Sequence, residues 1–221
     1  MTMTALSTQP TEGAIRFSYR LATPDVRDRL DREPFARLVA WRHILKRLQL
    51  IGRHARRYDG YGYGNLSVRD PRDPTRFYIT ASQTSGAGTL RIADLVRVDR
   101  YDVERFEVDA VGDRAPSSES ITHGMVYAAD ATIAWIMHGH APSIWRAAAG
   151  LRLATTGPDV EYGSRAMAGA VDALLTRERA RPLLFVTLGH EDGVFACGAT
   201  ADDTGALLVR THAAALTRTS R

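Results

Sequence analysis

The residues best suited to chemistry are three histidines, each at the end of an apolar run. His138 and His140 follow IAWIM, and His190 follows LLFVTLG. Residues two apart in an extended chain face the same side, so both imidazoles of His138-Gly139-His140 can bind one metal ion, with Gly139 leaving the far side open. His190 would complete a three-histidine set with an open position, as in catalytic zinc sites. The pair alone fits equally well two polar residues that close a strand.

A second group precedes the segment that leads to these histidines. Ser117, Ser118 and Glu119 come directly before an apolar helical pattern. Either serine suits the N-cap of that helix, and Glu119 suits its first turn, where the helix dipole favours a carboxylate. Two hydroxyls at a helix N-terminus form a candidate anion site. The same three residues are also ordinary chemistry for starting a helix.

Two glycine-containing loops add neutral groups that bind anions. One contains Asn65 directly after a glycine, and the other contains Ser85 and Gly86 after a threonine. Backbone amides next to such side chains can surround an anion without a lysine, as oriented-amide nests do. Taken separately, each loop is also a common turn sequence.

The elements that position these residues follow from apolar periodicity and from Gly and Pro placement. Helices are predicted over 33–50, 118–129, 162–177 and 202–216, and strands over 66–68, 77–79, 95–98, 106–111, 132–137, 183–188 and 194–196. Strands flanked by helices on this schedule predict a layered α/β domain with helices on both faces of the sheet. Because the early strands are joined by short turns, the sheet should be mostly antiparallel or mixed.

Composition narrows the class of protein. The chain has 221 residues, 44% apolar and 24% charged, which excludes fibrous and disordered classes and fits one domain over 15–221 after a flexible tail over 1–14. No apolar run is long enough to cross a membrane, and no secretory pattern is present, so we expect a cytoplasmic protein. The net charge of +4 is spread along the chain, which does not indicate nucleic-acid binding.

Two residue types limit the possible mechanisms. With Cys197 as the only cysteine, a metal must be held by histidines and carboxylates. Lys46 is the only lysine and lies in an arginine-rich helical pattern, which makes it a poor nucleophile for imine chemistry because that needs a desolvated amine.

The order of these motifs carries more information than any one of them. GNLS, a Thr/Ser-Gly loop, SSE, HGH and a last histidine before a small apolar strand resemble the class II aldolase/adducin family over most of the chain, from about Phe35 to Leu216. The resemblance implies an αβα sandwich with a central, mostly antiparallel sheet. It also implies a homotetramer with active sites between subunits.

The same resemblance implies roles for individual residues. His138, His140 and His190 would be the metal ligands and Glu119 the catalytic carboxylate. The residues around the anionic end of a small hydroxy-carbonyl or sugar-phosphate-like substrate would be Asn65, Ser85, Gly86, Ser117 and Ser118. Zn²⁺ is the expected ion, with Mn²⁺, Fe²⁺ or Co²⁺ as alternatives.

The implied reaction is that of a divalent-metal-dependent lyase of the aldolase type. It would make or break a carbon–carbon bond beside a carbonyl through a metal-stabilised enediolate, with Glu119 moving the proton. A decarboxylase, a dehydratase or an iron-dependent oxygenase on the same scaffold are alternatives, as is a non-catalytic binding module like adducin. The general acid stays unassigned: family aldolases use tyrosines late in the chain, whereas no tyrosine follows Tyr162 here, and Tyr61, Tyr63 and Tyr162 are the candidates.

Overall fold

The fold is built on one large mixed sheet. The computed structural model describes residues 13–25 and 28–219, so residues 1–12 of the predicted tail lie outside it. The strands of the large sheet are β1 (Ser18–Ala22), β4 (Asn65–Arg69), β5 (Phe77–Thr80), β6 (Leu95–Asp102), β7 (Glu107–Gly112), β8 (Trp135–His140), β9 (Ala154–Thr155), β10 (Leu183–Val186) and β11 (Gly193–Gly198). Their spatial order is β1-β7-β6-β5-β4-β8-β11-β10-β9, and β2 (Gly52–Arg53) pairs separately with β3 (Gly62–Tyr63).

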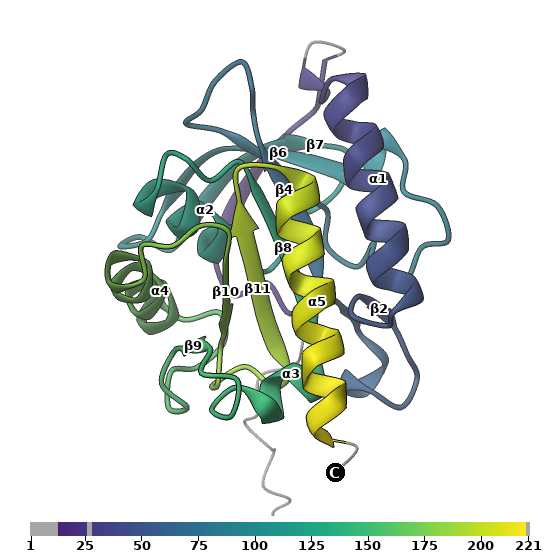
Figure 1. The fold of residues 1–221 in the computed structure, drawn as a ribbon. Coiled ribbons are helices and arrows are strands. Elements are labelled where there is room, and N and C mark those ends of the chain that lie inside the picture. Colours follow the sequence, from purple (N-terminus) through teal and green to yellow (C-terminus); the bar gives the residue numbers. More distant parts are fainter. Residues whose placement is uncertain (1–12, 26–27, 220–221) are drawn as a thin grey trace, which may run out of the picture.

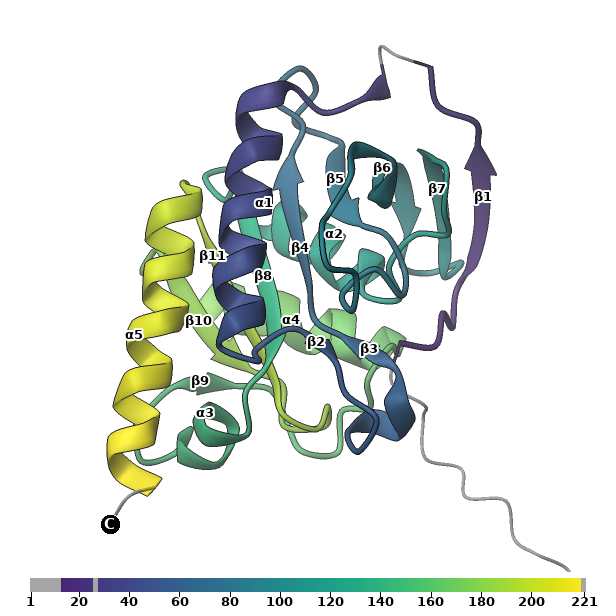
Figure 2. The ribbon, with the colours of Figure 1, turned by 90° about the vertical axis from the view of Figure 1, so that its right-hand side faces the viewer.

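Most neighbouring strands are antiparallel, as predicted. The central run from β7 through β10 is antiparallel at every pairing, and only the outermost strands, β1 on β7 and β9 on β10, pair in parallel. Both parallel partners were absent from the predicted elements. Figure 2 shows β1 at one edge of the sheet, beside β7.

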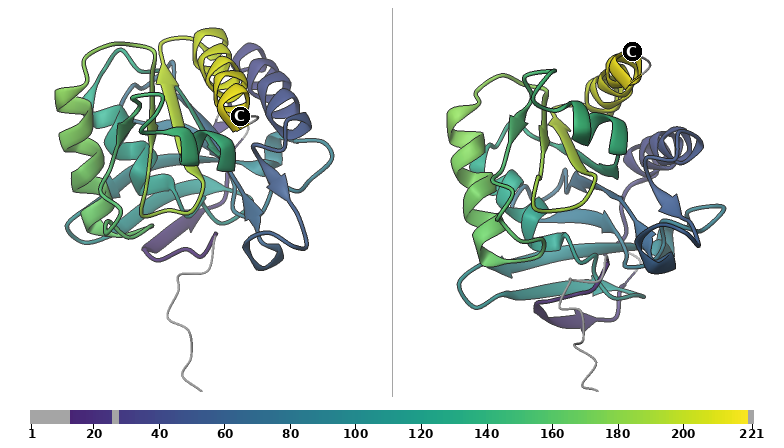
Figure 3. Two further views of the ribbon diagram at one scale, coloured as in Figure 1. Left: turned by 60° about the horizontal axis from the view of Figure 1, so that its bottom comes forward. Right: turned by 90° about the horizontal axis from the view of Figure 1, so that it is seen from below.

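Helices cover both faces of the sheet, which confirms the predicted layers. The helices are α1 (Arg32–Arg47), α2 (Ser120–Ala129), α3 (Pro142–Ala147), α4 (Arg165–Arg177) and α5 (Ala201–Thr219). Helices α1 and α5 lie on one side, and α2 and α4 on the other (Figures 1 and 3). Each side has its own apolar core, one centred on Leu38, Leu45 and Leu208, the other on Val126 and Val171.

Strand β8 lies in the middle of the sheet between β4 and β11, and every residue in it is buried. The prediction ended this strand at Met137, whereas the strand continues through His138 and Gly139 and ends at His140. Backbone pairing explains the extension: Asn65 of β4 lies opposite His138, and Gly193 of β11 lies opposite His140. The two imidazoles are therefore positioned by a central strand.

Two further properties belong to the described part of the chain. Cys197, in β11, is completely buried, and burial raises the pKa of its thiol to about 12. Among the described helices, none has both the length and the apolar character required to cross a bilayer.

Candidate functional site

Three buried histidines meet at one end of β8. One nitrogen from each of His138, His140 and His190 lies within 4.8 Å of the others. His190 was predicted at the end of a strand. Strand β10 ends earlier, at Val186, so His190 lies in the turn between β10 and β11. The structure thus brings together the three histidines that the sequence analysis selected.

The ring of His138 is held in a defined tautomer. Its Nδ1 lies 3.1 Å from the carbonyl oxygen of Val194, which can only accept a hydrogen bond, so Nδ1 carries the proton and Nε2 keeps its lone pair for a ligand. The ring also stacks on Phe195, with ring centroids 4.2 Å apart. Such fixed histidines are typical of metal ligands.

The far side of Gly139 is closed, which corrects the expectation that it would be open. A Cβ added there would lie 2.8 Å from the carbonyl oxygen of Leu50, and the amide of His140 donates to that same oxygen at 2.7 Å. The chain after α1 packs directly on β8 at this point. Glycine is therefore needed between the two histidines because another backbone occupies the space of a side chain.

The carboxylate of Glu119, the residue directly before α2, approaches the histidine cluster. It is buried, and its Oε1 lies 3.4 Å from His190 Nδ1 and 3.9 Å from His138 Nε2. Helix α2 begins at Ser120, so Glu119 itself is the N-cap residue, and the prediction of a serine N-cap with Glu119 in the first turn is wrong. Ser117 instead bonds locally, its Oγ accepting from the amide of Glu119 at 3.3 Å. This turn directs the Glu119 carboxylate toward the histidines.

The donor set fits a divalent transition metal. Three imidazoles are neutral nitrogen ligands suited to Zn²⁺, Fe²⁺, Mn²⁺ or Co²⁺, and three protein ligands leave further coordination positions for substrate. The fixed Nδ1 proton of His138 and the nearby carboxylate of Glu119 add the outer contacts that such sites use. The identity of the ion does not follow from these residues.

Aromatic rings line the cluster, and one of them was missed by the sequence analysis. The ring of Tyr58 lies 4.6 Å from His140, that of Tyr63 lies 5.5 Å from His140, and that of Tyr162 lies 4.2 Å from His190, between centroids. Tyr61, by contrast, is 41% exposed. Of the candidate acids, Tyr63 and Tyr162 are therefore beside the histidines, and Tyr58 joins them.

Tyr58 is held by charged neighbours. Its hydroxyl donates to Asp192 Oδ2 at 2.7 Å and accepts from Arg57 at 2.7 Å. Burial, followed by the bond to Asp192, raises the pKa of the Tyr58 hydroxyl far above its usual value. Tyr58 and Asp59 both have positive φ, 49° and 52°, a conformation that costs free energy outside glycine. Tyr61 and Tyr63 alternate with glycines in the sequence, whereas nothing in the sequence marks Tyr58.

A polar cavity lies next to the cluster and gathers most of the residues proposed for the substrate's anionic end. Its lining includes Asn65, Ser85, Ser117 and Ser118. Asn65 connects the cavity to the histidine cluster, because it lines the cavity and also pairs with His138 across the sheet. Its Oδ1 is buried and has no hydrogen-bond partner among the described residues, as expected for a group that meets a ligand. Gly86 is the exception, since it packs against the side chain of Arg53.

Gln83 is a cavity residue that the sequence analysis did not select. It lines the cavity, its Oε1 accepts from the amide of Gly62 at 3.0 Å, and its φ is 59°. The side chain thus connects the loop after β5 to β3. The TASQTSGAG segment contains no motif for such a contact, which depends on two loops meeting in space.

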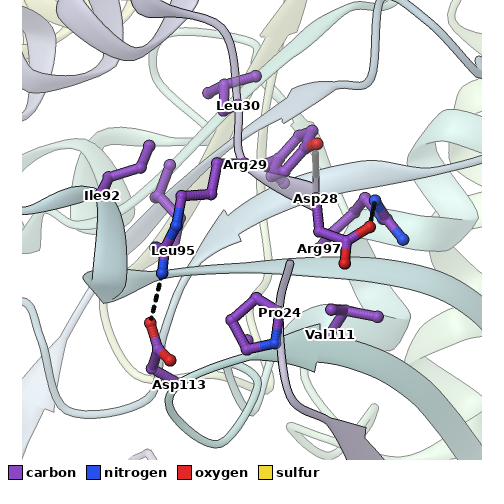
Figure 4. A pocket seen from close by; sticks show the side chains of 11 residues that line it. Pro24, Asp28, Arg29, Leu30, Ile92, Leu95, Arg97, Val111 and Asp113 are labelled. Atoms are coloured by element: carbon purple, nitrogen blue, oxygen red, sulfur yellow. Dashed lines mark hydrogen bonds and ion pairs between the residues drawn. The ribbon is translucent and has the colours of Figure 1, made fainter. Parts of the chain in front are cut away.

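Another pocket lies between the segment before α1 and the sheet (Figure 4). Its charged residues are already paired: Arg97 binds Asp28 at 2.7 Å, and Arg29 lies 3.4 Å from Asp113. None of its lining residues lines the polar cavity. These ion pairs hold the segment before α1 against β6 and against the residue that follows β7, and we assign the pocket no ligand.

His123 is a buried histidine outside the cluster. It is completely buried on α2, its Nδ1 lies 2.7 Å from Ser67 Oγ, and burial lowers its pKa to about 3. Ser67 Oγ also lies 2.7 Å from the hydroxyl of Tyr127. His123 is therefore a neutral packing residue between α2 and the sheet.

The chain belongs to the class II aldolase and adducin family: the sequence model described as the class II aldolase and adducin N-terminal domain matches residues 47–218. No protein of curated function gave a match.

Solved structures show the same fold at low sequence identity. An L-fuculose 1-phosphate aldolase is 20% identical with a TM-score of 0.62, covering 87% of this chain and 89% of its own. The L-fuculose-1-phosphate aldolase of Thermus thermophilus is 19% identical, with a TM-score of 0.61 and coverage of 84% and 92%. A sugar-phosphate aldolase of Thermotoga maritima is 16% identical, with a TM-score of 0.57 and coverage of 86% and 96%. These similarities confirm the predicted fold class, and the match to the sequence model confirms the predicted family.

Proposed function

We propose that this protein is a divalent-metal-dependent lyase of the aldolase type. It would make or break a carbon–carbon bond beside a carbonyl in a small hydroxy-carbonyl substrate with an anionic end, such as a sugar phosphate. The observation that supports this most directly is the buried carboxylate of Glu119 within 3.4 Å of His190 and 3.9 Å of His138. A protein that only binds a partner needs neither three clustered imidazoles nor a carboxylate among them.

His138, His140 and His190 would hold the metal, with Zn²⁺ as the first choice. When bound, the cation supplies Lewis-acid chemistry, which stabilises negative charge developing on a carbonyl and its neighbouring hydroxyl. The neutral imidazoles leave the full charge of the ion available for that purpose. The aromatic rings of Tyr58 and Tyr162 lie against the imidazoles of His140 and His190, an arrangement that would limit the access of water to them.

Glu119 would act as the general base and acid at its carboxylate. The carboxylate is buried, faces the histidines and follows directly after two serines of the cavity. A substrate whose anion lies by Ser117 and Ser118 therefore places its reacting carbons near the Glu119 oxygens. Glu119 would take the proton from the substrate hydroxyl or carbon and return it after the bond change.

The remaining assignments follow from the family. We expect a homotetramer with active sites between subunits. Within this chain, Tyr58, Tyr63 and Tyr162 are the tyrosines beside the histidines.

Metal content measured by elemental analysis tests the proposal first. Untagged protein purified without chelator should hold about one Zn²⁺, Mn²⁺, Fe²⁺ or Co²⁺ per chain, and the His138→Ala/His140→Ala variant should hold almost none. The matched control is His43→Ala/His54→Ala, which removes two exposed histidines and should keep the metal. Wild-type protein that takes up no metal after reconstitution would overturn the proposal.

Products then separate the possible reactions. Metal-loaded protein is incubated with small hydroxy-carbonyl compounds, with and without a phosphate or carboxylate end. Two carbonyl fragments indicate aldol cleavage, carbon dioxide indicates decarboxylation, and one dehydrated product indicates a dehydratase. Consumption of dioxygen by the iron-loaded form would indicate an oxygenase.

A further inference from the structure

Two cations on α1 bind the backbone of the loop that borders the polar cavity. Arg42 Nη2 donates to the carbonyl oxygens of Thr84, Ser85 and Ala87 at 2.9, 3.1 and 2.8 Å. Lys46 Nζ donates to those of Gly86 and Ala87 at 2.9 and 2.6 Å. Four consecutive carbonyls, over residues 84–87, thus face one turn of α1, on which the chain's only lysine lies.

Neither cation forms an ion pair with a described carboxylate. Arg42 is buried at 3% exposure, and burial lowers its pKa, against a weaker opposing effect of Asp94. Asp94 is itself paired with Arg91 and Arg114. Carbonyl dipoles compensate only part of a buried charge, so a net positive potential is left behind the loop.

The loop's amides point the other way. In a trans peptide, the N–H group is directed opposite to the preceding carbonyl. The carbonyls of Thr84 and Ser85 face α1, so the amides of Ser85 and Gly86 face away from it. Neither amide donates to an acceptor among the described residues, whereas those of Thr84 and Ala87 are used within the loop. Ser85 lines the cavity, its neighbour Gly86 does not, and no residue of α1 does.

We propose that Arg42 and Lys46 are positioning residues for substrate binding. They hold the carbonyls of residues 84–87, so that the amides of Ser85 and Gly86 are presented to the substrate's anion, and they add an uncompensated positive charge behind those amides. This inference rests on the proposed function for the existence of an anionic substrate. It assigns Lys46 a role in binding through the loop and none in bond chemistry.

The test is anion binding followed at the loop's own amides. Inorganic phosphate and, separately, glycolate are titrated into ¹⁵N-labelled, zinc-loaded protein while the amide resonances of Ser85 and Gly86 are recorded. Lys46→Met keeps a side chain of similar length that favours a helix but removes the donor, and it should raise the Kd of the anion that binds by about tenfold. Lys46→Arg, which restores a cationic donor, should stay within about twofold of the wild type.

Arg47→Met is the matched control. It removes one positive charge from the same turn of α1, but Arg47 is exposed and bonds to no described residue, so its Kd should stay within about twofold of the wild type. Amide hydrogen exchange at Ser85 and Gly86 should accelerate in Lys46→Met and not in Arg47→Met. Arg42→Lys is a second variant for the same titration, because it keeps the positive charge but loses the branched guanidinium that donates to three carbonyls.

Three outcomes would overturn the inference: equal Kd values for Lys46→Met and the wild type, equal weakening in Lys46→Met and Arg47→Met, or wild-type amides that shift with neither anion. Metal content distinguishes this failure from failure of the proposed function. If the wild type holds its metal and turns over substrate, but Lys46→Met binds anions as tightly as the wild type, the proposed function stands and only the role of Lys46 is contradicted.

Discussion

The histidine cluster and the polar cavity beside it are built by different means. In the cluster, His138 and His140 are fixed by strand register in the middle of the sheet, and the ring of His138 stacks on Phe195. In the cavity, the binding groups lie on loops and on the turn before α2, and the loop over 84–87 is held by side chains of a distant helix. The first region depends on the sheet, and the second depends on hydrogen bonds between loops.

This difference separates the consequences of mutation. Changes to the three histidines or to strand β8 should affect metal content, turnover and folding together, because the residues that support them are also core residues. Changes in the cavity should affect binding of the anion and leave folding and metal content unaltered. Four substitutions test that division, beginning with the largest expected effect.

Glu119→Gln should lower turnover by a factor of about 10² to 10⁴ while the metal stays bound, because the amide cannot accept and return a proton. Turnover and metal content are measured on the same preparation. Glu191→Gln, which alters an exposed carboxylate in the turn of His190, serves as the control and should behave like the wild type. Unchanged turnover in Glu119→Gln would remove its assigned role.

Gly139→Ala should destabilise the metal-free protein by about 1–3 kcal/mol, since its Cβ would overlap the Leu50 carbonyl on a strand that cannot move away. Gly169→Ala is the comparison: on α4 the added methyl meets nothing within 4 Å, and alanine favours a helix by up to about 1 kcal/mol. Urea unfolding gives both free energies. Equal stability of the two variants would show that the contact between Leu50 and β8 yields easily.

His123→Asn should reduce the loss of stability in acid. The folded-state pKa of His123 is about 3, against about 6.5 when unfolded, so the unfolded chain takes up a proton that the folded chain refuses. The contribution of His123 is therefore complete above pH 6.5 and falls by about 1.4 kcal/mol per pH unit below it. Between pH 7 and 5, metal-free wild type should lose about 2 kcal/mol more than the variant in urea titrations. Parallel losses in the two proteins would show that His123 is protonated in the fold.

Ser118→Ala should have the smallest effect, weakening the binding of inorganic phosphate or glycolate by about fivefold through loss of one hydroxyl. Metal content and urea stability should stay at wild-type values, as expected of a cavity residue. Ser143→Ala, on α3 away from the cavity, is the control for serine removal. A loss of metal in Ser118→Ala would contradict the separation of the two regions.

The sequence predicted the parts that depend on local pattern. The histidine pair on β8 and the helices around it carry strong apolar periodicity, and the ordered motifs led to the correct family and layers. The position of Glu119 was predicted to within one residue of the helix start. Its N-cap role was missed because Ser117 uses its hydroxyl on the amide of Glu119 without capping the helix.

The parts that the sequence did not predict depend on distant contacts. Strand β1 is exposed along its whole length, so no buried face marks SYRLA as a strand, and it is defined only by parallel pairing with β7. Arg42 and Lys46 bind backbone carbonyls, which any residue provides, so no motif marks their partners. Tyr58 reaches His140 through a turn with positive φ at two residues that do not favour it.

The position of Cys197 provides an internal reporter of how the centre opens. It lies on β11, opposite Ile136 of β8 and Leu183 of β10, and both burial and its raised pKa keep it unreactive in the closed sheet. A thiol reagent can react only when the sheet opens or when the layer of α2 and α4 that shares its apolar core moves away. The rate at which Cys197 is labelled can be compared between the metal-loaded and metal-free protein. The ratio of the two rates measures how much a bound ion suppresses opening around the middle of the sheet.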